Sequence, residues 1–562
     1  MWLIKTDTLK LKNVINPEPG SYAILSHTWR EDEISFQDFR DTDKAKAMMD
    51  FGKIKKTCEL ALDRDIPYAW IDTCCIDKTS SAELSEAINS MFTWYHNAAV
   101  CFVYLSDLGP SSEPTVVALR RCRWFSRGWT LQELIAPTNV QFYNSHWQPV
   151  ATKTEIPKEL MEVTGINELA IIFRDKGTDV REVLRSLPVS IKMSWAASRV
   201  TTRPEDMAYC LLGLFDINMP MLYGEGERAF IRLQEAICGQ TNDLSLFAWT
   251  AAPAASSVPS TPYRGILAHH PREFGEQPNK LSPERHSFNL SVWGFDFQHC
   301  DFTITNRGLQ MDNARLLHAP HNRIFLDLGL PVHGTNGDVT SDASIKRVGI
   351  FVEWTPEGYF RVEPDRMAVL TRKELGMRIR AHRIYVHTIG RAPGSTFNSY
   401  SDVIDGAYSR LCFAIDKRCY AEILDAAPAS AWSYNKTAFI FPLAAEEFAG
   451  VLHLKLRVES WIGQAVLIFY KTLNTTHWRY HIIIEGSSEW NHWVQAEYGL
   501  ENLFRSRIFR DYMETVKRAM STAPEGYEAR ATFGVNRLRA ILKTSESTHR
   551  LTESILTYDY RG

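Results

Sequence analysis

The sequence predicts an α/β protein with a parallel sheet near its N-terminus, followed by a helical extension and a β-rich C-terminal region. Three observations support this prediction. Short apolar runs alternate with amphipathic helical patterns over residues 22–150. Capped helical patterns continue to about residue 250, and β-branched or aromatic runs separated by turn residues fill 263–562. Strands that alternate with helices form parallel sheets with right-handed crossovers.

Length, charge and hydropathy exclude several classes of protein. The chain has 562 residues, which is too long for one hydrophobic core. It carries 63 basic and 66 acidic residues without a long block of one sign, so we expect no nucleic-acid partner. No run approaches the ~20 apolar residues of a membrane span, and the N-terminus lacks the order of a signal peptide. We therefore expect a cytoplasmic protein with no membrane span.

Four strands are expected in the N-terminal region, within the apolar runs at residues 22–29, 68–77, 99–107 and 140–143. Two helices separate the first three. The first has an apolar face with spacings of three and four and runs to Asp65; the second begins with a capping box from Ser80 to Glu83. The residues of the two apolar faces are Phe51, Ile54, Cys58, Ala61 and Leu84, Ile88, Met91, Tyr95.

The helix over residues 126–137 carries the most informative motif. Trp129 and Glu133 are four residues apart and should share one helix face. His27, Asp72 and Asp107 lie at or just after the carboxyl ends of predicted strands. Open parallel sheets bind ligands at these ends. We therefore expect one crevice lined by this helix and the strand ends.

The remaining chain is expected to form two further parts. A capping box from Thr202 to Glu205 predicts a helix over 206–215, and a second helix directs Phe230, Leu233 and Ile237 inward. The expected boundaries are 1–160 for the α/β domain, 161–250 for the helical extension, 251–262 for a linker and 263–562 for the β-rich region. The β-rich region should be a mostly antiparallel sandwich, with strands near 302–305, 323–328, 348–352, 437–441, 465–470 and 480–484.

The ten cysteines are scattered without a C-x-x-C motif, and several lie in apolar runs, such as Cys101, Cys210 and Cys412. Buried free thiols explain them better than disulfides or a zinc site, and we expect no metal. Cys74 and Cys75 suggest a thiol nucleophile with His27 as its base. No oxyanion motif accompanies them, so a carboxylate mechanism is favoured.

Three blocks within residues 22–150 resemble a fungal heterokaryon-incompatibility (HET) domain: YAILSHTW at 22–29, WIDTCCID at 70–77 and RGWTLQE at 127–133. The segments 209–216 and 222–227 are similar to the region that follows this domain in many members. The resemblance implies nonself recognition and the programmed cell death that follows fusion of incompatible hyphae. HET domains are distantly similar to Toll/interleukin-1 receptor (TIR) domains. This implies a flavodoxin-like (TIR-like), doubly wound sheet.

Some TIR domains hydrolyse NAD with the glutamate of a Trp-x-x-x-Glu helix, which corresponds here to Glu133. NAD is then a substrate, and no cofactor is expected. Glu133 would stabilise an oxocarbenium-like transition state. The leaving group is already cationic, so no general acid is required. The expected substrate-binding residues are the aromatic Trp29 and Trp129, the polar His27, Asp72 and Asp107, and the cationic Arg30 and Arg127.

Each of these residues also has a structural interpretation. Glu133 could be a solvated helix charge, His27 a buried core histidine and Asp72 a turn cap, and the indoles could pack in the core. The alternative function is a non-catalytic signalling module. In that case the α/β domain associates with itself or with other incompatibility proteins, and the C-terminal half senses a ligand.

Overall fold

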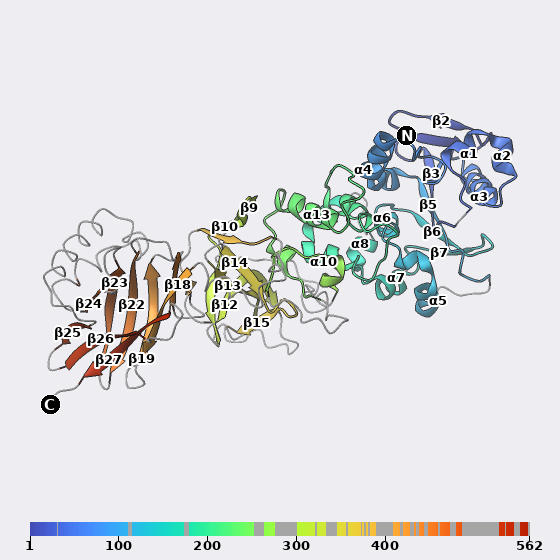
Figure 1. Cartoon of the computed structure of the whole chain (residues 1–562). Coiled ribbons are helices and arrows are strands. Elements are labelled where there is room, and N and C mark those ends of the chain that lie inside the picture. Colours follow the sequence, from blue (N-terminus) through green and yellow to red (C-terminus); the bar gives the residue numbers. More distant parts are fainter. Residues whose placement is uncertain are drawn as a thin grey trace. The chain divides into compact units, whose positions relative to one another are not determined.

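The computed structural model divides the chain into two compact units, residues 1–253 with 267–293 and residues 254–266 with 294–562 (Figure 1). It describes residues 1–251 except 31, 111–114 and 173–178, residues 263–275, and residues 300–559 except 321–322, 333–345, 356–357, 372–373, 376–377, 380–382, 389–407, 416–419, 428–431, 434–437, 443–447, 459–460, 472–478, 486–489, 491–527, 534–535 and 545–550. The expected linker at 251–262 lies outside the described residues, apart from Ala251.

A seven-stranded sheet with the order β2-β1-β4-β3-β5-β6-β7 organises the first unit. Its strands are β1 (Trp2–Lys5), β2 (Leu11–Asn13), β3 (Tyr22–His27), β4 (Tyr68–Trp70), β5 (Val100–Tyr104), β6 (Val140–Tyr143) and β7 (Pro149–Thr152). The central strands β4, β3, β5 and β6 are parallel, whereas β1 and β7 pair with them in antiparallel fashion. The predicted parallel sheet is therefore confirmed, with additional antiparallel edges.

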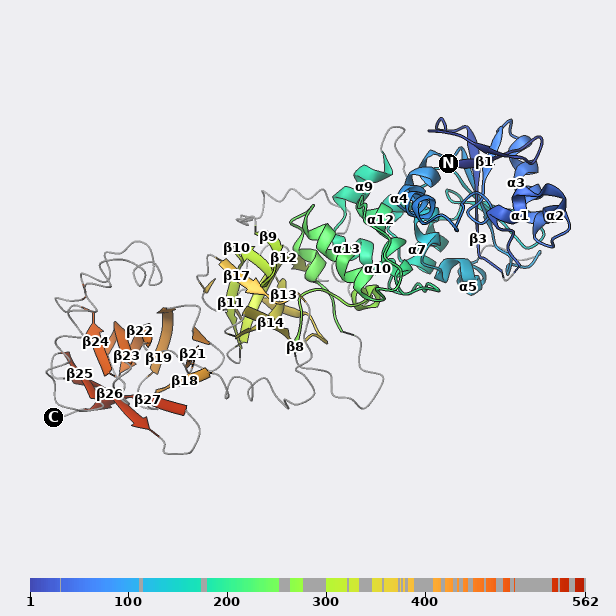
Figure 2. The ribbon, with the colours of Figure 1, turned by 45° about the horizontal axis from the view of Figure 1, so that its top comes forward.

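Helices cover both faces of this sheet. The chain passes from β3 through α3 to β4, and then returns through α4 to β5 on the other side of β3. Right-handed crossovers in opposite directions place α3 and α4 on opposite faces, as Figures 1 and 2 show. The strand β3 is buried along its whole length because both of its faces are covered.

The helices before β6 are α1 (Phe36–Arg40), α2 (Thr42–Lys46), α3 (Phe51–Leu62), α4 (Ser81–Asn97), α5 (Val116–Arg121) and α6 (Thr130–Ile135), with the 3-10 turn η1 (Arg123–Ser126). The helical block after β7 contains α7 (Pro157–Thr164), α8 (Glu168–Ile171), α9 (Val180–Ser186), α10 (Val189–Ser194), α11 (Asp206–Tyr209), α12 (Leu212–Phe215) and α13 (Arg228–Cys238), with η2 (Leu244–Phe247) and η3 (Pro271–Phe274).

Two predicted helix starts differ from the structure. The Ser80 hydroxyl caps α4 by accepting from the Glu83 amide, but the Glu83 carboxylate accepts from the Asp77 amide. The capping box is therefore only half formed. The predicted helix over 206–215 is wrong, because two short helices, α11 and α12, replace it. Glu205 does not complete a box there, since its carboxylate accepts from the amides of Gly224 and Gly226.

The second unit is β-rich, as predicted, and most of its strand pairs are antiparallel. Its strands are β8 (Tyr263–Arg264), β9 (Asp301–Thr305), β10 (Gly308–Asp312), β11 (Leu316–Ala319), β12 (Arg323–Val332), β13 (Lys346–Thr355), β14 (Gly358–Val362), β15 (Ala368–Thr371), β16 (Arg378–Ile379), β17 (Arg383–Val386), β18 (Tyr408–Ile415), β19 (Tyr420–Ala427), β20 (Trp432–Ser433), β21 (Ala438–Pro442), β22 (Phe448–Val458), β23 (Trp461–Lys471), β24 (Arg479–Ile484), β25 (Glu528–Phe533), β26 (Asn536–Thr544) and β27 (Leu551–Asp559). They form a ten-stranded, a six-stranded and a four-stranded sheet. The rings of Phe439 and Phe469 join the last two sheets, with centroids 4.8 Å apart.

The cysteines whose side chains the structure describes are free and buried, as predicted. They are Cys58, Cys74, Cys75, Cys101, Cys122, Cys210, Cys238 and Cys300. The side chain of Cys412 lies outside the described residues. None of the helices within the described ranges combines the length and hydropathy that a bilayer crossing requires.

Candidate functional site

Glu133 lies on α6, which packs beside the end of β3. Its side chain is buried, with the residue only 5% exposed, and the hydroxyl of Ser26 donates a hydrogen bond to its Oε2. The indole Nε1 of Trp124 in turn donates to the Ser26 oxygen at 2.7 Å. Glu133 is therefore neither a solvated surface charge nor a member of an ion pair within the described residues. It is the acceptor at the end of a buried hydrogen-bond chain.

Burial and, to a smaller extent, the nearby carboxylate of Asp72 raise the pKa of Glu133, which is about 8. The Ser26 hydrogen bond, the charge of Arg127 and a hydrogen bond with Tyr95 lower this pKa but do not offset burial. A carboxyl group with a pKa near 8 is mostly protonated at neutral pH. The Glu133 side chain thus has the raised pKa that buried functional carboxyl groups often show.

A second buried cluster lies at the carboxyl end of the same strand, around His27 and Glu33. The Nε2 atom of His27 is 3.4 Å from Glu33 Oε2, and the Lys53 ammonium is 2.5 Å from Glu33 Oε1. Desolvation acts to raise the pKa of Glu33. Hydrogen bonds and charge from His27 and then Lys53 overcome it and lower the pKa to about 2. Lys53 also contacts Asp50 at 3.0 Å, so this cluster is firmly held by charge.

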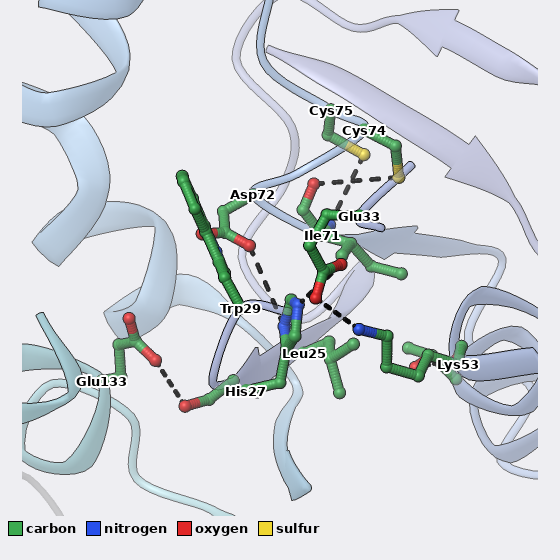
Figure 3. A network of polar contacts seen from close by, with 12 residues as sticks. Leu25, His27, Trp29, Glu33, Lys53, Ile71, Asp72, Cys74, Cys75 and Glu133 are labelled. Carbon is green, nitrogen blue, oxygen red and sulfur yellow. Dashed lines mark hydrogen bonds and ion pairs between the residues drawn. The ribbon is translucent and has the colours of Figure 1, made fainter. Parts of the chain in front are cut away.

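Asp72 joins this cluster to an exposed indole (Figure 3). Its Oδ2 accepts a 2.8 Å hydrogen bond from Trp29 Nε1, and its Oδ1 lies 3.9 Å from His27 Nδ1. His27 Nδ1 and Asp72 Oδ1 are buried and have no hydrogen-bond partner among the described residues. Asp72 does not act as the predicted turn cap in any hydrogen bond within this part of the chain. A buried donor or acceptor without a partner favours a polar ligand group at this place.

Trp29 is the accessible part of the arrangement, since the residue is 40% exposed. The ammonium of Lys78 lies over its ring, 3.7 Å from the centroid. Figure 3 shows the indole beside Asp72 and His27, with Glu133 on the neighbouring element. Four predicted site residues thus come together where β3 and β4 end, namely His27, Trp29, Asp72 and Glu133.

The other predicted site residues lie elsewhere. Asp107 is exposed, and its carboxylate accepts from the Arg123 amide at 2.7 Å. Trp129 forms a hydrogen bond that lowers the pKa of Asp206, although desolvation dominates and raises that pKa. Trp129 is therefore directed to the helical block, and the crevice expected to contain both Trp129 and Glu133 does not form. The predicted roles of Asp107 and Trp129 in ligand binding stay predictions.

The two arginines predicted to bind substrate, Arg30 and Arg127, lie at the margins of these two clusters. Arg30 Nη1 lies 4.0 Å from Asp50 Oδ1, at the margin of the cluster around Glu33. Arg127 lowers the pKa of Glu133 through its charge. Its backbone oxygen accepts from Arg199 at 2.7 Å. A role of either arginine toward pyrophosphate stays a prediction.

The geometry disfavours the thiol alternative. Cys74 is fully buried, and desolvation raises its pKa well above the ordinary value. The sulfur of Cys75 accepts from the Ile71 amide at 3.4 Å in a tight turn after β4. A thiolate is the reactive form of cysteine, and burial of this kind suppresses it.

Sequence reasoning missed several members of the network: Ser26, Glu33, Lys53, Tyr95 and Trp124. Ser26 alone carried a signal, because a hydroxyl interrupts the apolar run Ala23–Leu25 in a strand buried on both faces. A polar side chain in such a strand needs a buried partner.

Comparisons with known proteins match the same part of the chain. Residues 22–122 match the family model described as heterokaryon incompatibility protein (HET), and residues 228–320 match a domain of unknown function (DUF8212). A 225-residue region is 43% identical to the vegetative incompatibility protein HET-E-1 of Podospora anserina. The aligned region covers 38% of this chain but only 16% of that protein. No solved structure matches the chain.

Proposed function

Because its N-terminal unit carries a heterokaryon-incompatibility domain, we propose that this protein acts in nonself recognition and triggers programmed cell death by hydrolysing NAD. The proposed reaction breaks the bond between nicotinamide and ribose, whose electron pair leaves with nicotinamide, and water then adds to the ribose carbon and releases a proton. Supporting evidence for a TIR-like, flavodoxin-like domain comes from the order β4-β3-β5-β6 of the parallel strands. In chain order this is 2-1-3-4, the order with which flavodoxin-like sheets begin.

The observation that carries the proposal is the gathering of Glu133, Asp72, His27 and Trp29 at the carboxyl end of β3. The strand order reverses at β3, because the chain runs from β3 to β4 on one side and then from β4 across to β5 on the other side. Ligands of open α/β sheets bind in the crevice at such a reversal. A perturbed carboxyl group at this position is a physical reason to expect chemistry there.

Glu133 is proposed to stabilise the transition state as an anion. The nicotinamide leaves as a neutral molecule from a cationic pyridinium, so positive charge develops on the ribose while the bond breaks. A carboxylate held beside that charge lowers the barrier. Glu133 must first lose its proton, and the positive charge of bound NAD favours this loss, because a nearby cation stabilises the ionised form.

The neighbouring residues supply binding. The exposed face of Trp29 suits the pyridinium ring, since cations over an indole are attracted by its ring electrons. Lys78 occupies this face in the free protein and has to leave it. The unpartnered Oδ1 of Asp72 can accept a hydrogen bond from a ribose hydroxyl or from the carboxamide of nicotinamide.

The experiment is to incubate the purified protein with NAD and to measure free nicotinamide. We expect release by the wild type and a loss of at least 100-fold in Glu133→Gln, consistent with the loss of one preorganised group. Glu162→Gln is the matched control, because the Glu162 side chain is on the surface of α7 and 67% exposed. Equal release by both variants would refute the role of Glu133.

The burial of Glu133 favours one alternative, a non-catalytic signalling module. A carboxyl that is 5% exposed and holds a hydrogen bond from Ser26 can serve as a structural group at the base of a docking surface. Expression of Glu133→Gln in a fungal host separates the two functions. Cell death that persists in this variant supports docking, and cell death that disappears while the fold is retained supports catalysis.

A further inference from the structure

The loop before α6 is paired to the helical block by backbone hydrogen bonds. The amide of Val200 donates to the Ser126 oxygen at 2.7 Å, and the Gly128 amide donates to the Val200 oxygen at 2.9 Å. Arg127 and Val200 form an isolated parallel bridge. The segment that begins the helix of Glu133 is thus held by residues about 70 positions later in the chain.

Arg199 fixes this junction from inside. The residue is 1% exposed, and its Nη1 donates to the Arg127 oxygen at 2.7 Å and to Thr130 Oγ1 at 2.9 Å. Its Nε donates to the Trp195 oxygen at 3.2 Å. Thr130 is the first residue of α6, and Glu133 follows three positions later. One guanidinium therefore ties the helical block to the first turn of this helix.

Gly128 shows how closely the two parts pack. A Cβ atom built at this glycine would lie 2.5 Å from Thr201 Cγ2 and 3.1 Å from Cys210 Sγ. Both neighbours belong to the helical block. Any side chain at position 128 would push the block away from the loop, so glycine is required there by space and not by backbone conformation.

The charge of Arg199 at this junction also interacts with the carboxyl group of Glu133. The pKa of Arg199 is lowered to about 10, because desolvation outweighs the opposite effects of Cys210 and then of the Glu133 carboxyl, which raise it. This coupling is reciprocal, because a group that favours the charged arginine is itself favoured in its charged form by that arginine. Removal of the guanidinium charge should therefore make Glu133 harder to ionise.

We propose that Arg199 is a positioning residue for Glu133, and that residues 195–210 of the helical block complete the functional site of the α/β domain. The importance of this site for the cell rests on the proposed function. The positioning of Glu133 by Arg199 does not, because it concerns the position and the ionisation of one carboxyl group in the free protein.

The test measures the protonation of Glu133 directly in the full chain. The infrared carbonyl band of a protonated carboxyl group, taken as the difference between each protein and its Glu133→Gln counterpart, is titrated from pH 5 to 10. We expect Arg199→Met to move the midpoint upward and Arg199→Lys to move it less, since lysine retains the charge. The control is Lys192→Met, which removes a buried cation of the same helical block that lies over the Phe215 ring.

An unchanged midpoint in Arg199→Met, or an equal shift in Lys192→Met, would overturn the proposal. If Arg199→Met does not fold, hydrogen exchange of the α6 amides in Arg199→Lys decides the question, with faster exchange expected there than in Lys192→Met. Equal exchange in the two variants would count against Arg199. None of these readouts requires turnover of NAD, so an inactive wild type would refute the proposed function and leave this inference standing.

Discussion

At the scale of single residues, two carboxyl groups near the end of β3 have pKa values shifted in opposite directions. Glu33 is held ionised by His27 and Lys53, whereas Glu133 accepts a hydrogen bond from the Ser26 hydroxyl and keeps its proton near neutrality. Two carboxyl groups with separated pKa values at one strand end are a common arrangement of catalytic sites. The difference between the two pKa values arises from the hydrogen-bonding and charged partners of each carboxyl group, because desolvation alone raises the pKa of both Glu33 and Glu133.

Replacing Glu133 by glutamine is predicted to change how stability depends on pH. The folded state keeps the proton of Glu133 up to about pH 8, whereas the unfolded chain loses it near the ordinary glutamate pKa of 4.5. Between these values the unfolded state binds fewer protons. This group's contribution to the free energy of unfolding therefore falls as pH rises, by up to about 5 kcal/mol. Calorimetry from pH 5 to 8.5 should show a smaller decrease of Tm in Glu133→Gln than in the wild type; parallel curves would contradict a raised pKa.

Lys78→Met is predicted to lower KM for NAD two- to fivefold with kcat unchanged. In the proposed site the Lys78 ammonium over the Trp29 ring would compete with the pyridinium of NAD, and an exposed cation–π contact contributes about 0.5–1 kcal/mol. Nicotinamide release at varied NAD concentrations measures this change. Lys55→Met is the control, because that side chain is exposed on α3. A higher KM in Lys78→Met would mean that the lysine assists binding.

At the scale of elements, the sequence predicted strands better than contacts. All four expected parallel strands exist, since apolar runs of this kind leave few alternatives to strands in a sheet covered on both faces. The capping box predicted from Thr202 to Glu205 does not form, because the Glu205 carboxylate accepts from the amides of a loop about 20 residues later, which no local pattern indicates. The helical spacing likewise predicts that Trp129 and Glu133 share one face. It does not predict their partners, Asp206 and Ser26, because these lie far away in the sequence.

The short helix α6 is also held at its C-terminal end, by Lys153. The buried ammonium donates to the Leu134 oxygen at 3.1 Å and to the Pro137 oxygen at 2.6 Å, satisfying carbonyls that a helix end leaves open. Lys153→Met is predicted to lower the free energy of unfolding by about 1–3 kcal/mol, because it leaves these two buried carbonyl oxygens without their hydrogen-bond donor. Urea denaturation measures the loss, with exposed Lys158→Met as the control. Equal stability of the two variants would exclude a capping role.

At the scale of the whole molecule, the α/β sheet and the helical block form one compact unit, and the β-rich residues form another. The Cβ that Gly213 lacks would lie 2.2 Å from Phe92 Cβ, so α12 packs directly on α4. Together with Arg199, this contact makes the helical block part of the domain that holds Glu133. The family match at 22–122 ends before Arg199 and Gly213, the residues that the helical block contributes to these contacts.

A fragment of residues 1–160 is therefore predicted to be less stable than a fragment of residues 1–275. The shorter fragment exposes the face of α4 that α12 covers and frees the loop that Val200 pairs. Urea unfolding followed by circular dichroism should give a broad transition for 1–160 and a cooperative transition for 1–275. Identical midpoints would show that the α/β part folds without the helical block.

The most direct test of the central claim, that Glu133 acts as an anion on NAD, is the pH dependence of kcat/KM for nicotinamide release. This ratio reports the ionisation of groups in the free enzyme. We predict that it rises with pH through an apparent pKa near 8, the value that burial gives Glu133, and that Glu133→Gln abolishes this rise together with the activity. Nicotinamide release that is independent of pH in this range, or that survives in Glu133→Gln, would contradict the account.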